Sequence, residues 1–241
     1  MKKGTRRLAL GLTLILLLGT AAMERLRGAH VAVVGLGGVG SWCAEGLARA
    51  GVGALTLLDE DTVSRTNINR QLVALTSTLG KSKAETAAAR VRDISPDCRV
   101  TPLAARYDSE HREALFFQDY DYIVDAIDLV ACKVDLICTA RERGIPIVSA
   151  LGTGNKREAQ LLCLTDISRT VGCPLARVVR RELRARGVAH HPVVFSPEPA
   201  APAEQRETPP PGRRSVPGSL VWVPATAGLL LCQYVVTELI K

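Results

Sequence analysis

The chain lacks cysteine pairs at metal-binding spacing and is poor in aromatic side chains. Its seven cysteines are an odd number, and no two of them form a C-x-x-C pair. The sequence therefore supports neither a zinc ribbon nor a framework of disulfides. Aromatic residues make up only 4% of the chain, which argues against a base-stacking platform like that of single-strand-binding proteins.

What the chain does have is enough apolar material for one α/β core. It has 241 residues, of which 47% are hydrophobic, and this length buries a full core without a second independent domain. The formal net charge is +7. Such an excess favours a polyanionic partner such as RNA, although lysines and arginines around bound phosphates would add to the same excess.

Short apolar runs alternate with segments of helical spacing over residues 29–154. Strands are predicted at 30–34, 54–58, 99–103, 121–124 and 145–149, and helices at 38–50, 81–94, 109–117 and 132–143. This alternation is typical of an α/β fold. We therefore expect a Rossmann-like, doubly wound and mostly parallel sheet, with helices on both faces and right-handed crossovers.

The pattern changes after this nucleotide-binding segment, and residues 155–241 are predicted to form a C-terminal extension. It should hold strands at 160–164, 193–195 and 221–223, a basic helix at 174–186 and a closing helix that ends near residue 240. Residues 196–218 are rich in proline and should form an extended or flexible loop. Residues 1–28 are expected to be an N-terminal apolar helix or arm.

The turn after the first predicted strand is rich in glycine. Gly35, Gly37, Gly38 and Gly40 form a G-x-G-G-x-G pattern ahead of a helix. Glycines allow a tight turn and the close approach of a phosphate, and the helix N-terminus offers free N–H groups. Asp59 ends the second strand, where a carboxylate takes the ribose hydroxyls. These features fit NAD, FAD and ATP equally.

A polar segment with two cationic side chains distinguishes ATP from the dinucleotides. Asn67, Arg70 and Gln71 lie in the segment N-I-N-R-Q, and Lys83 follows it. A triphosphate and the charge of nucleotidyl transfer benefit from such cations, whereas a dinucleotide held on backbone N–H groups does not need them. A solvated polar turn with a surface lysine is the alternative. Asp61 is likewise either a second polar contact or a solvated turn residue.

The fourth predicted strand ends in the sequence D-A-I-D, which spans residues 125–128. Ligands of doubly wound sheets bind at the carboxyl ends of the strands. A carboxylate there, Asp128, is predicted to bind Mg²⁺ that bridges the nucleotide phosphates. The alternative is that Asp125 and Asp128 cap the next helix.

Taken in order, these motifs resemble the adenylation domain of the ubiquitin-activating-type family. The order is G-x-G-G-x-G, L-L-D-x-D, N-x-N-R-Q, K-x-K and D-A-x-D. The resemblance implies that the four glycines form the nucleotide loop, with ATP and Mg²⁺ as cofactors. It also implies that Asp59 binds the ribose, that Asn67, Arg70 and Lys83 contact the phosphates, and that Asp128 organises Mg²⁺ and the reaction.

Three C-terminal segments are similar to the branch of this family that modifies tRNA. They are residues 171–187, 193–198 and 217–224. The resemblance implies ATP-dependent dehydration of N6-threonylcarbamoyladenosine in tRNA by a homodimer. The threonyl carboxylate would attack the α-phosphate of ATP and release pyrophosphate, and the carbamoyl nitrogen would then close a ring and expel AMP. Because that attack is intramolecular, no covalent enzyme intermediate is needed.

Other functions stay open at this point. An adenylyltransferase for a small ubiquitin-like sulfur-carrier protein is disfavoured because the zinc cysteines of those enzymes are missing. An NAD-binding module is disfavoured by Arg70, Lys83 and Asp128. A thioester role for Cys173 is less favoured than a buried thiol, and a sulfur-relay protein is an open partner. The arginines of the predicted basic helix are candidate tRNA contacts, with a solvated helix face as the alternative; they are Arg177, Arg180, Arg181, Arg184 and Arg186. Arg213 and Arg214, in the proline-rich loop, are candidates for closing over the substrate.

The two ends of the chain allow more than one interpretation. Residues 1–7 are basic and residues 8–18 are apolar, the layout of a secretory signal peptide. We favour a packed helix and a cytoplasmic location, because an enzyme that consumes ATP has little use for export. Residues 215–237 carry no charge, which raises a membrane span or membrane association, but Pro224 and Gln233 argue against it.

Relatives carry an arginine on the N-terminal helix that reaches the nucleotide of the partner subunit. The resemblance places that position near Thr13 in this sequence. Arg6 or Arg7 would have to replace it for the contact between subunits to be made.

Overall fold

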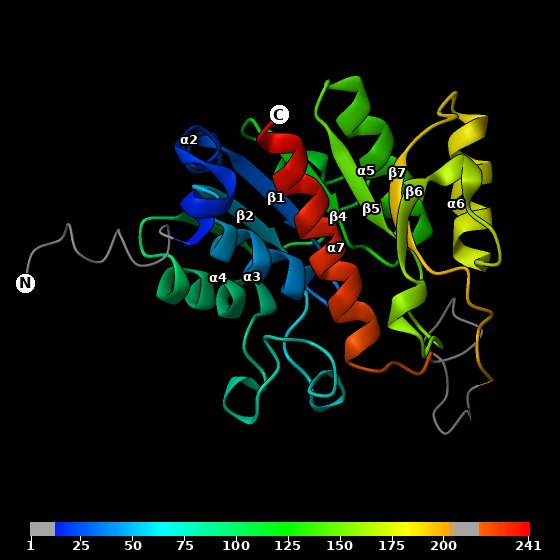
Figure 1. Cartoon of the computed structure of the whole chain (residues 1–241). Helices are drawn as coiled ribbons and strands as arrows, with labels where there is room; N and C mark the ends of the chain where they lie inside the picture. The colour runs from blue at the N-terminus through cyan, green and yellow to red at the C-terminus, as the bar shows by residue number, and fades with distance from the viewer. Residues whose placement is uncertain (1–12, 203, 205–216) are drawn as a thin grey trace, which may run out of the picture.

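A seven-stranded sheet runs through the middle of the molecule (Figure 1). The structure is a computed structural model and describes residues 13–202, 204 and 217–241. The strand order is β3-β2-β1-β4-β5-β7-β6, and every neighbouring pair is parallel except β6 with β7. The strands are β1 (His30–Val34), β2 (Ala54–Leu58), β3 (Arg99–Leu103), β4 (Tyr122–Asp125), β5 (Ile147–Ala150), β6 (Cys163–Asp166) and β7 (Pro192–Phe195). The predicted α/β fold with a mostly parallel sheet is confirmed.

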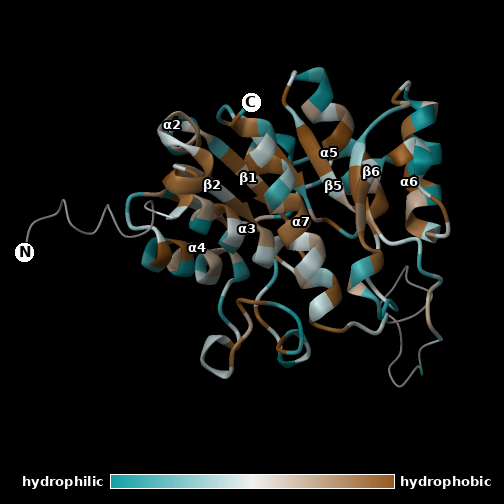
Figure 2. Cartoon of the chain, viewed as in Figure 1, coloured by the Kyte–Doolittle hydropathy of each residue, from teal (hydrophilic) through white to brown (hydrophobic). Residues whose placement is uncertain are grey.

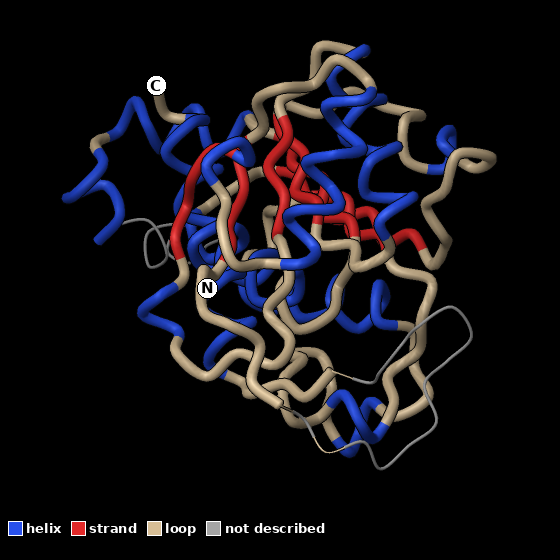
Figure 3. The backbone as a smooth tube through the Cα atoms, turned by 90° about the vertical axis from the view of Figure 1, so that its right-hand side faces the viewer, coloured by secondary structure: helices blue, strands red, loops and turns tan. Residues whose placement is uncertain are grey.

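Helices cover both faces of this sheet, as Figure 3 shows with the strands in red between them. One face packs against α2, α3, α4 and α7, and the other packs against α5 and α6. The helices are α2 (Thr20–Gly28), α3 (Gly40–Ala50), α4 (Lys83–Ile94), α5 (Val130–Glu142), α6 (Pro174–Ala185) and α7 (Trp222–Leu239). The 3₁₀ turns among the described residues are η1 (Arg65–Asn67), η2 (Thr76–Thr78), η3 (Arg112–Ala114), η4 (Ala159–Leu161) and η5 (Ile167–Arg169).

Alternation along the central strand divides the core into two layers. In β1, Val31 and Val33 pack toward α3 and α7, whereas Ala32 and Val34 pack toward α5. Successive side chains of a strand point to opposite faces, and a parallel sheet with helices on both faces is buried on both. The strands are accordingly brown, and therefore hydrophobic, in Figure 2, and the polar colours gather on the outer helices and loops.

The predicted C-terminal extension, residues 155–241, is joined closely to residues 29–154. Its strand β7 pairs with β5, and its last helix, α7, lies along α3. The two helices approach closely at glycines: a Cβ atom on Gly228 would lie 2.3 Å from the carbonyl oxygen of Val39, and one on Gly46 would lie 2.8 Å from Cys232 Sγ. This packing brings the start of α7 to the same edge of the sheet as the turn after β1.

Two predicted elements are wrong. The helix predicted at 109–117 is only the 3₁₀ turn η3. The side chain of Asp108 accepts hydrogen bonds from the backbone N–H groups of Glu110 and His111, and these bonds close a tight turn instead. The strand predicted at 221–223 is the beginning of α7. Proline is tolerated in the first turn of a helix, so Pro224 does not stop α7 from starting at Trp222.

The ends of the chain are described only in part. Residues 13–18 are helical, and the chain then turns at Gly19, which has a φ of 85°, before α2 begins. Arg6, Arg7, Arg213 and Arg214 lie outside the described residues, as does most of the proline-rich loop. Within the described ranges, no helix combines the length and the apolar character that crossing a bilayer requires.

Candidate functional site

The glycine turn after β1 is held between the turn after β4 and the start of α3. Gly35 has a φ of 91°, and a Cβ atom there would lie 2.8 Å from the carbonyl oxygen of Ala126. A Cβ atom on Gly40 would lie only 1.8 Å from the carbonyl oxygen of Gly35. Both positions therefore require glycine, and a tight glycine turn ahead of a helix is the arrangement in which a phosphate can approach backbone N–H groups.

Asp59 lies directly after β2 and is fastened to this glycine turn. Its carboxylate accepts the backbone N–H of Leu36 at 2.6 Å and that of Asp61 at 2.9 Å. Burial raises the pKa of Asp59 above its usual range, although the nearby Lys83 ammonium and the two backbone hydrogen bonds oppose this effect. The carboxylate is thus held in a fixed orientation at the edge where a ribose would lie.

Lys83 is the first residue of α4 and is not a surface lysine, so that alternative is wrong. It is only 4% exposed, and its Nζ lies 2.7 Å from Asp61 Oδ2 and 3.8 Å from Asp59 Oδ1. Asp61 itself is exposed and pairs with the lysine. The pair holds a cation beside the carboxylate of Asp59, where a bound phosphate oxygen would compete with Asp61 for it.

The segment that contains Arg70 forms a compact polar turn. Asn67 is buried, and its side-chain oxygen accepts the backbone N–H of Ser64 at 3.0 Å, which closes η1. Arg70 Nη1 donates to the Thr66 carbonyl at 2.8 Å and to Asn69 Oδ1 at 2.9 Å. Asn67 therefore shapes this segment, and the segment orients the side chain of Arg70.

Two contacts place this turn against the glycine turn. The Cγ atom of Arg70 lies 3.4 Å from the position a Cβ atom would take on Gly38. Gln71 is buried beside Gly37, and its Oε1 atom has no hydrogen-bond partner within the described part of the chain. Because buried acceptors are usually satisfied, an unpaired amide oxygen here is a group that a ligand donor can complete.

Asp125 is fully buried below the site and pairs with a lysine that sequence reasoning missed. Its Oδ2 lies 2.6 Å from Lys133 Nζ, and both side chains are inaccessible to solvent. Asp125 Oδ1 accepts the backbone N–H of Ile127 at 3.0 Å. The only signal in the sequence was a lysine in the otherwise apolar start of α5. Asp125 therefore supports the turn that carries Asp128.

Asp128 is exposed at the end of this turn. The residue at the N-cap position of α5 is Leu129, whose side chain makes no capping hydrogen bond, so neither Asp125 nor Asp128 occupies the N-cap position itself. No group of three or more potential ligands for a metal ion is found among the described residues. One exposed carboxylate suits Mg²⁺, which keeps several waters and is usually held by one or two carboxylates and by substrate phosphates.

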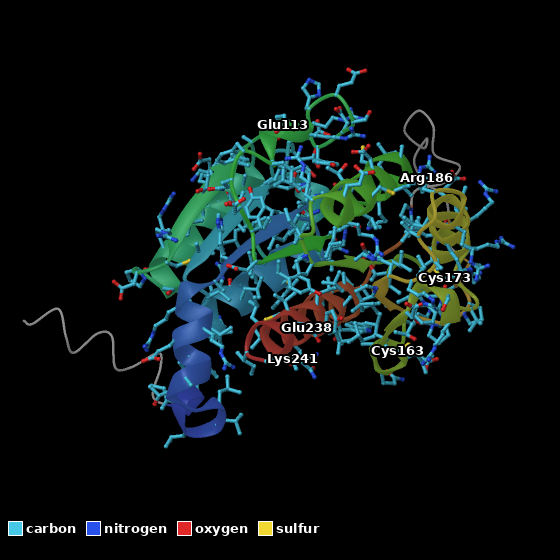
Figure 4. The ribbon with its side chains drawn as sticks, turned by 90° about the horizontal axis from the view of Figure 1, so that it is seen from above. Glu113, Cys163, Cys173, Arg186, Glu238 and Lys241 are labelled. Carbon is cyan, nitrogen blue, oxygen red and sulfur yellow. The ribbon has the colours of Figure 1, made fainter. Side chains whose placement is uncertain are left out.

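The predicted basic helix, α6, divides its arginines between two roles. Arg180 turns inward and donates to the Thr170 carbonyl at 2.6 Å, whereas Arg181 and Arg186 pair with Glu182. The remaining arginines of the set, Arg177 and Arg184, are exposed on the outer face. Cys173 and Arg186, labelled in Figure 4, flank the two ends of this helix.

Cys173 is buried, and its Sγ accepts the backbone N–H of Ala176 at 3.5 Å as the N-cap of α6. A capping role accounts for its position.

Comparison with known proteins gives this site a context. The model of the ThiF family matches residues 11–240. The chain is 40% identical over 240 residues to the tRNA threonylcarbamoyladenosine dehydratase of Bacillus subtilis. The aligned region covers 94% of this chain and 92% of that relative. It also superimposes on crystal structures of E. coli tRNA N6-threonylcarbamoyladenosine dehydratase, TcdA, in complex with AMP and with ATP. In both cases the TM-score is 0.87 at 34% identity, with 99% of this chain and 96% of the other covered.

Proposed function

The chain belongs to the ThiF family, and from this premise we propose that it catalyses the ATP-dependent dehydration of N6-threonylcarbamoyladenosine in tRNA. The observation that carries the proposal is the similarity to a dehydratase over nearly the full length of both chains. The superposition on a structure with bound ATP supports the nucleotide, because the glycine turn, Asp59 and Lys83 lie together at one edge of the sheet.

The reaction that we propose has two steps. An oxygen of the threonyl carboxylate bonds to the α-phosphorus of ATP, and pyrophosphate leaves with the electrons of the broken P–O bond. The carbamoyl nitrogen then bonds to the activated carbonyl carbon, loses its proton, and AMP departs with the former carboxylate oxygen. The substrate has lost one molecule of water overall, and the second step is intramolecular, so it requires positioning rather than a covalent enzyme intermediate.

The residues of the site divide this work. The backbone N–H groups of the glycine turn and of the start of α3 bind phosphate oxygens. The carboxylate of Asp59 accepts hydrogen bonds from the ribose hydroxyls. Arg70 and Lys83 stabilise the negative charge that builds up at the phosphorus. To contact the phosphate, the Lys83 ammonium must leave the carboxylate of Asp61, from which it lies 2.7 Å, and bind a phosphate oxygen instead. A flexible lysine side chain can make this short move.

Asp128 would hold Mg²⁺ together with the phosphates. When bound, the ion neutralises the charge of the phosphate oxygens. The role of the protein is to keep this carboxylate at the mouth of the site, and the buried pair of Asp125 and Lys133 supports the turn that does so.

The assembly and the setting of the enzyme are part of the same proposal. We expect a cytoplasmic homodimer, with tRNA as the macromolecular substrate and a sulfur-relay protein as an open partner. The chain's net charge of +7 suits an RNA substrate. The segment from Pro174 to Arg186 holds five arginines and one glutamate, and its exposed face is the surface that we assign to the RNA backbone.

The test is release of AMP and pyrophosphate from ATP and Mg²⁺ with threonylcarbamoylated or unmodified tRNA. We expect release only with the modified tRNA, and loss of at least two orders of magnitude in Asp128→Ala, because one electrostatic contact to a transition state contributes about that much. Asp93→Ala, an exposed aspartate on α4, is the matched control. Turnover that requires a small carrier protein instead of tRNA would contradict the proposal.

A further inference from the structure

An exposed tryptophan lies at the rim of the site and has no part in the proposed reaction. Trp222 is the first residue of α7, and half of it is exposed to solvent. Its indole Nε1 donates to the carbonyl oxygen of Arg157 at 2.8 Å. This hydrogen bond fixes the edge of the ring while the side chain remains partly open to solvent.

Contacts on both sides place Trp222 beside the glycine turn. Asn69 Nδ2 donates to the carbonyl oxygen of Ser219 at 3.0 Å. On the other side of Trp222, the Cβ atom of Pro224 lies 3.1 Å from the position of a Cβ atom on Gly38. The segment around Trp222 therefore rests on both the glycine turn and the polar turn that carries Arg70. In Figure 1 the orange start of α7 lies at the same end of the sheet as the loops that follow β2.

The strand order separates Trp222 from the ribose side of the site. Asp59 follows β2, and Arg157, the partner of Trp222, follows β5. The strands β1 and β4 lie between them. The ribose carboxylate and the tryptophan thus lie on opposite sides of the glycine turn. ATP would occupy the side of Asp59 in the proposed function, so we assign the side of Trp222 to the second substrate.

The chemistry around Trp222 suits a nucleobase with its phosphate. An aromatic face stacks on any base, and a guanidinium can contact the adjoining phosphate. Arg157, whose carbonyl holds the indole, is itself exposed. The chain has only nine aromatic residues other than histidine, so it has no extended stacking platform. One anchored tryptophan suffices for a single unstacked base, which is how proteins usually read RNA loops.

We propose that Trp222 stacks on an unpaired nucleobase of the RNA substrate and so guides the modified nucleotide into the site. This inference rests on the proposed function, because that function supplies RNA as the second substrate. It adds a residue that contacts the RNA and not ATP. Trp222 therefore contributes to the affinity for RNA and leaves the affinity for ATP unchanged.

A pair of substitutions separates stacking from the hydrogen bond. Trp222→Phe and Trp222→Leu both lose the indole N–H, but only phenylalanine keeps an aromatic face. Binding of an anticodon stem-loop without ATP is measured by fluorescence anisotropy of labelled RNA. We expect Trp222→Leu to weaken RNA binding by on the order of tenfold and Trp222→Phe by much less. The KM for ATP should stay at the wild-type value in both.

Intrinsic fluorescence gives a second readout that a purely structural role would not change. The chain has two tryptophans, Trp42 and Trp222. RNA should quench the wild-type emission, and the quenching should disappear in Trp222→Leu. Phe117→Leu is the matched control, because Phe117 is also about half exposed and precedes β4, at the opposite edge of the sheet.

The outcomes separate the inference from the proposed function. Equal RNA affinity and equal quenching in wild type and Trp222→Leu would overturn the inference while turnover with modified tRNA continued. A loss in Trp222→Phe as large as in Trp222→Leu would assign the effect to the hydrogen bond and would also overturn it. RNA binding that depends on Trp222 without any release of AMP would support the inference and contradict the proposed reaction.

Discussion

At the scale of single residues, a buried ion pair positions the carboxylate assigned to Mg²⁺. Asp125 and Lys133 are both inaccessible to solvent and lie 2.6 Å apart. Breaking such a pair leaves one charge buried and uncompensated, whereas replacing both partners by apolar residues is often tolerated. The pair also has a second function, because Asp125 holds the N–H of Ile127 in the turn that leads to Asp128.

We therefore predict different effects on stability and on activity. Lys133→Met should lower the free energy of unfolding by about 3–5 kcal/mol, measured by urea denaturation. The double substitution Lys133→Met with Asp125→Leu should recover most of that stability. It should not recover AMP release, because the N–H of Ile127 has then lost its acceptor. Full recovery of both would show that the pair has no positioning role.

A buried histidine next to this pair makes stability depend on pH. His191 Nε2 lies 2.7 Å from Ser149 Oγ, and its Nδ1 has no partner in the described part of the chain. Burial, with the nearby charge of Lys133, lowers the pKa of His191 from 6.5 to about 3. The imidazole is therefore neutral in the folded protein across the physiological range.

The sign of the effect follows from this lowered pKa. Below pH 6.5 the unfolded chain takes up a proton that the folded protein does not, so stability falls as the pH drops toward 3. Between pH 7 and pH 5 His191 should account for a loss of about 2 kcal/mol in the free energy of unfolding. His191→Gln should reduce this loss. The exposed neighbour His190 serves as control, and His190→Gln should leave the loss attributed to His191 in place.

At the scale of elements, α6 has an inner face that stabilises the fold and an outer face that carries uncompensated charge. Arg180 belongs to the inner face through its hydrogen bond to the Thr170 carbonyl. No acidic residue lies in the first turn of α6, although acidic side chains favour that position. Arg184 lies in the last turn, where a cation stabilises the helix, whereas the position of Arg177 brings the helix no such gain. Both side chains are exposed, so we assign them to RNA phosphates.

We predict that Arg177→Ala combined with Arg184→Ala weakens tRNA binding at all sequences. Each arginine that contacts a phosphate contributes about one unit to the slope of log affinity against log salt. The slope should therefore fall by about two in the double variant, measured by filter binding over a salt series. Arg49→Ala combined with Arg92→Ala removes two exposed arginines from α3 and α4. An equal loss in that control would assign the effect to net charge alone.

At the scale of the whole molecule, apolar side chains near the N-terminus remain uncovered in the single chain. Leu16 is 80% exposed and Leu17 is 84% exposed, although their neighbours Leu14 and Leu18 pack on the core. Adjacent exposed leucines are a surface that a second subunit can bury. This observation supports the homodimer in the proposed function.

Light scattering tests this proposal directly. The wild-type chain should give about twice its mass of 25.8 kDa, and Leu16→Glu combined with Leu17→Glu should give the mass of one chain. Val171→Glu, at another exposed apolar residue, should remain dimeric. A wild-type protein that is monomeric at micromolar concentration would contradict the proposed dimer.

The linear sequence determined the fold class and the identity of the motifs. Alternation of apolar runs with helical spacing is a local property, so it predicted all seven strands of the sheet to within a few residues, β6 least closely. Errors arose where local patterns were ambiguous. The apolar run before Pro224 suits a strand as well as a helix, and only its packing on α3 makes it the start of α7. At residues 109–117 a single side chain, Asp108, closed a turn where spacing favoured a helix.

Only the tertiary structure decided which polar residues act together. The motifs of the sequence marked Lys83 as a phosphate contact, but only the fold showed that it is buried beside the carboxylates of Asp59 and Asp61. The pairing of Lys133 with Asp125 and the place of Trp222 beside the glycine turn were equally invisible, since Trp222 lies more than 180 residues further along the chain than Gly38. Local propensity acts over a few neighbours, whereas charge compensation and burial depend on which distant segments the sheet and helices bring together.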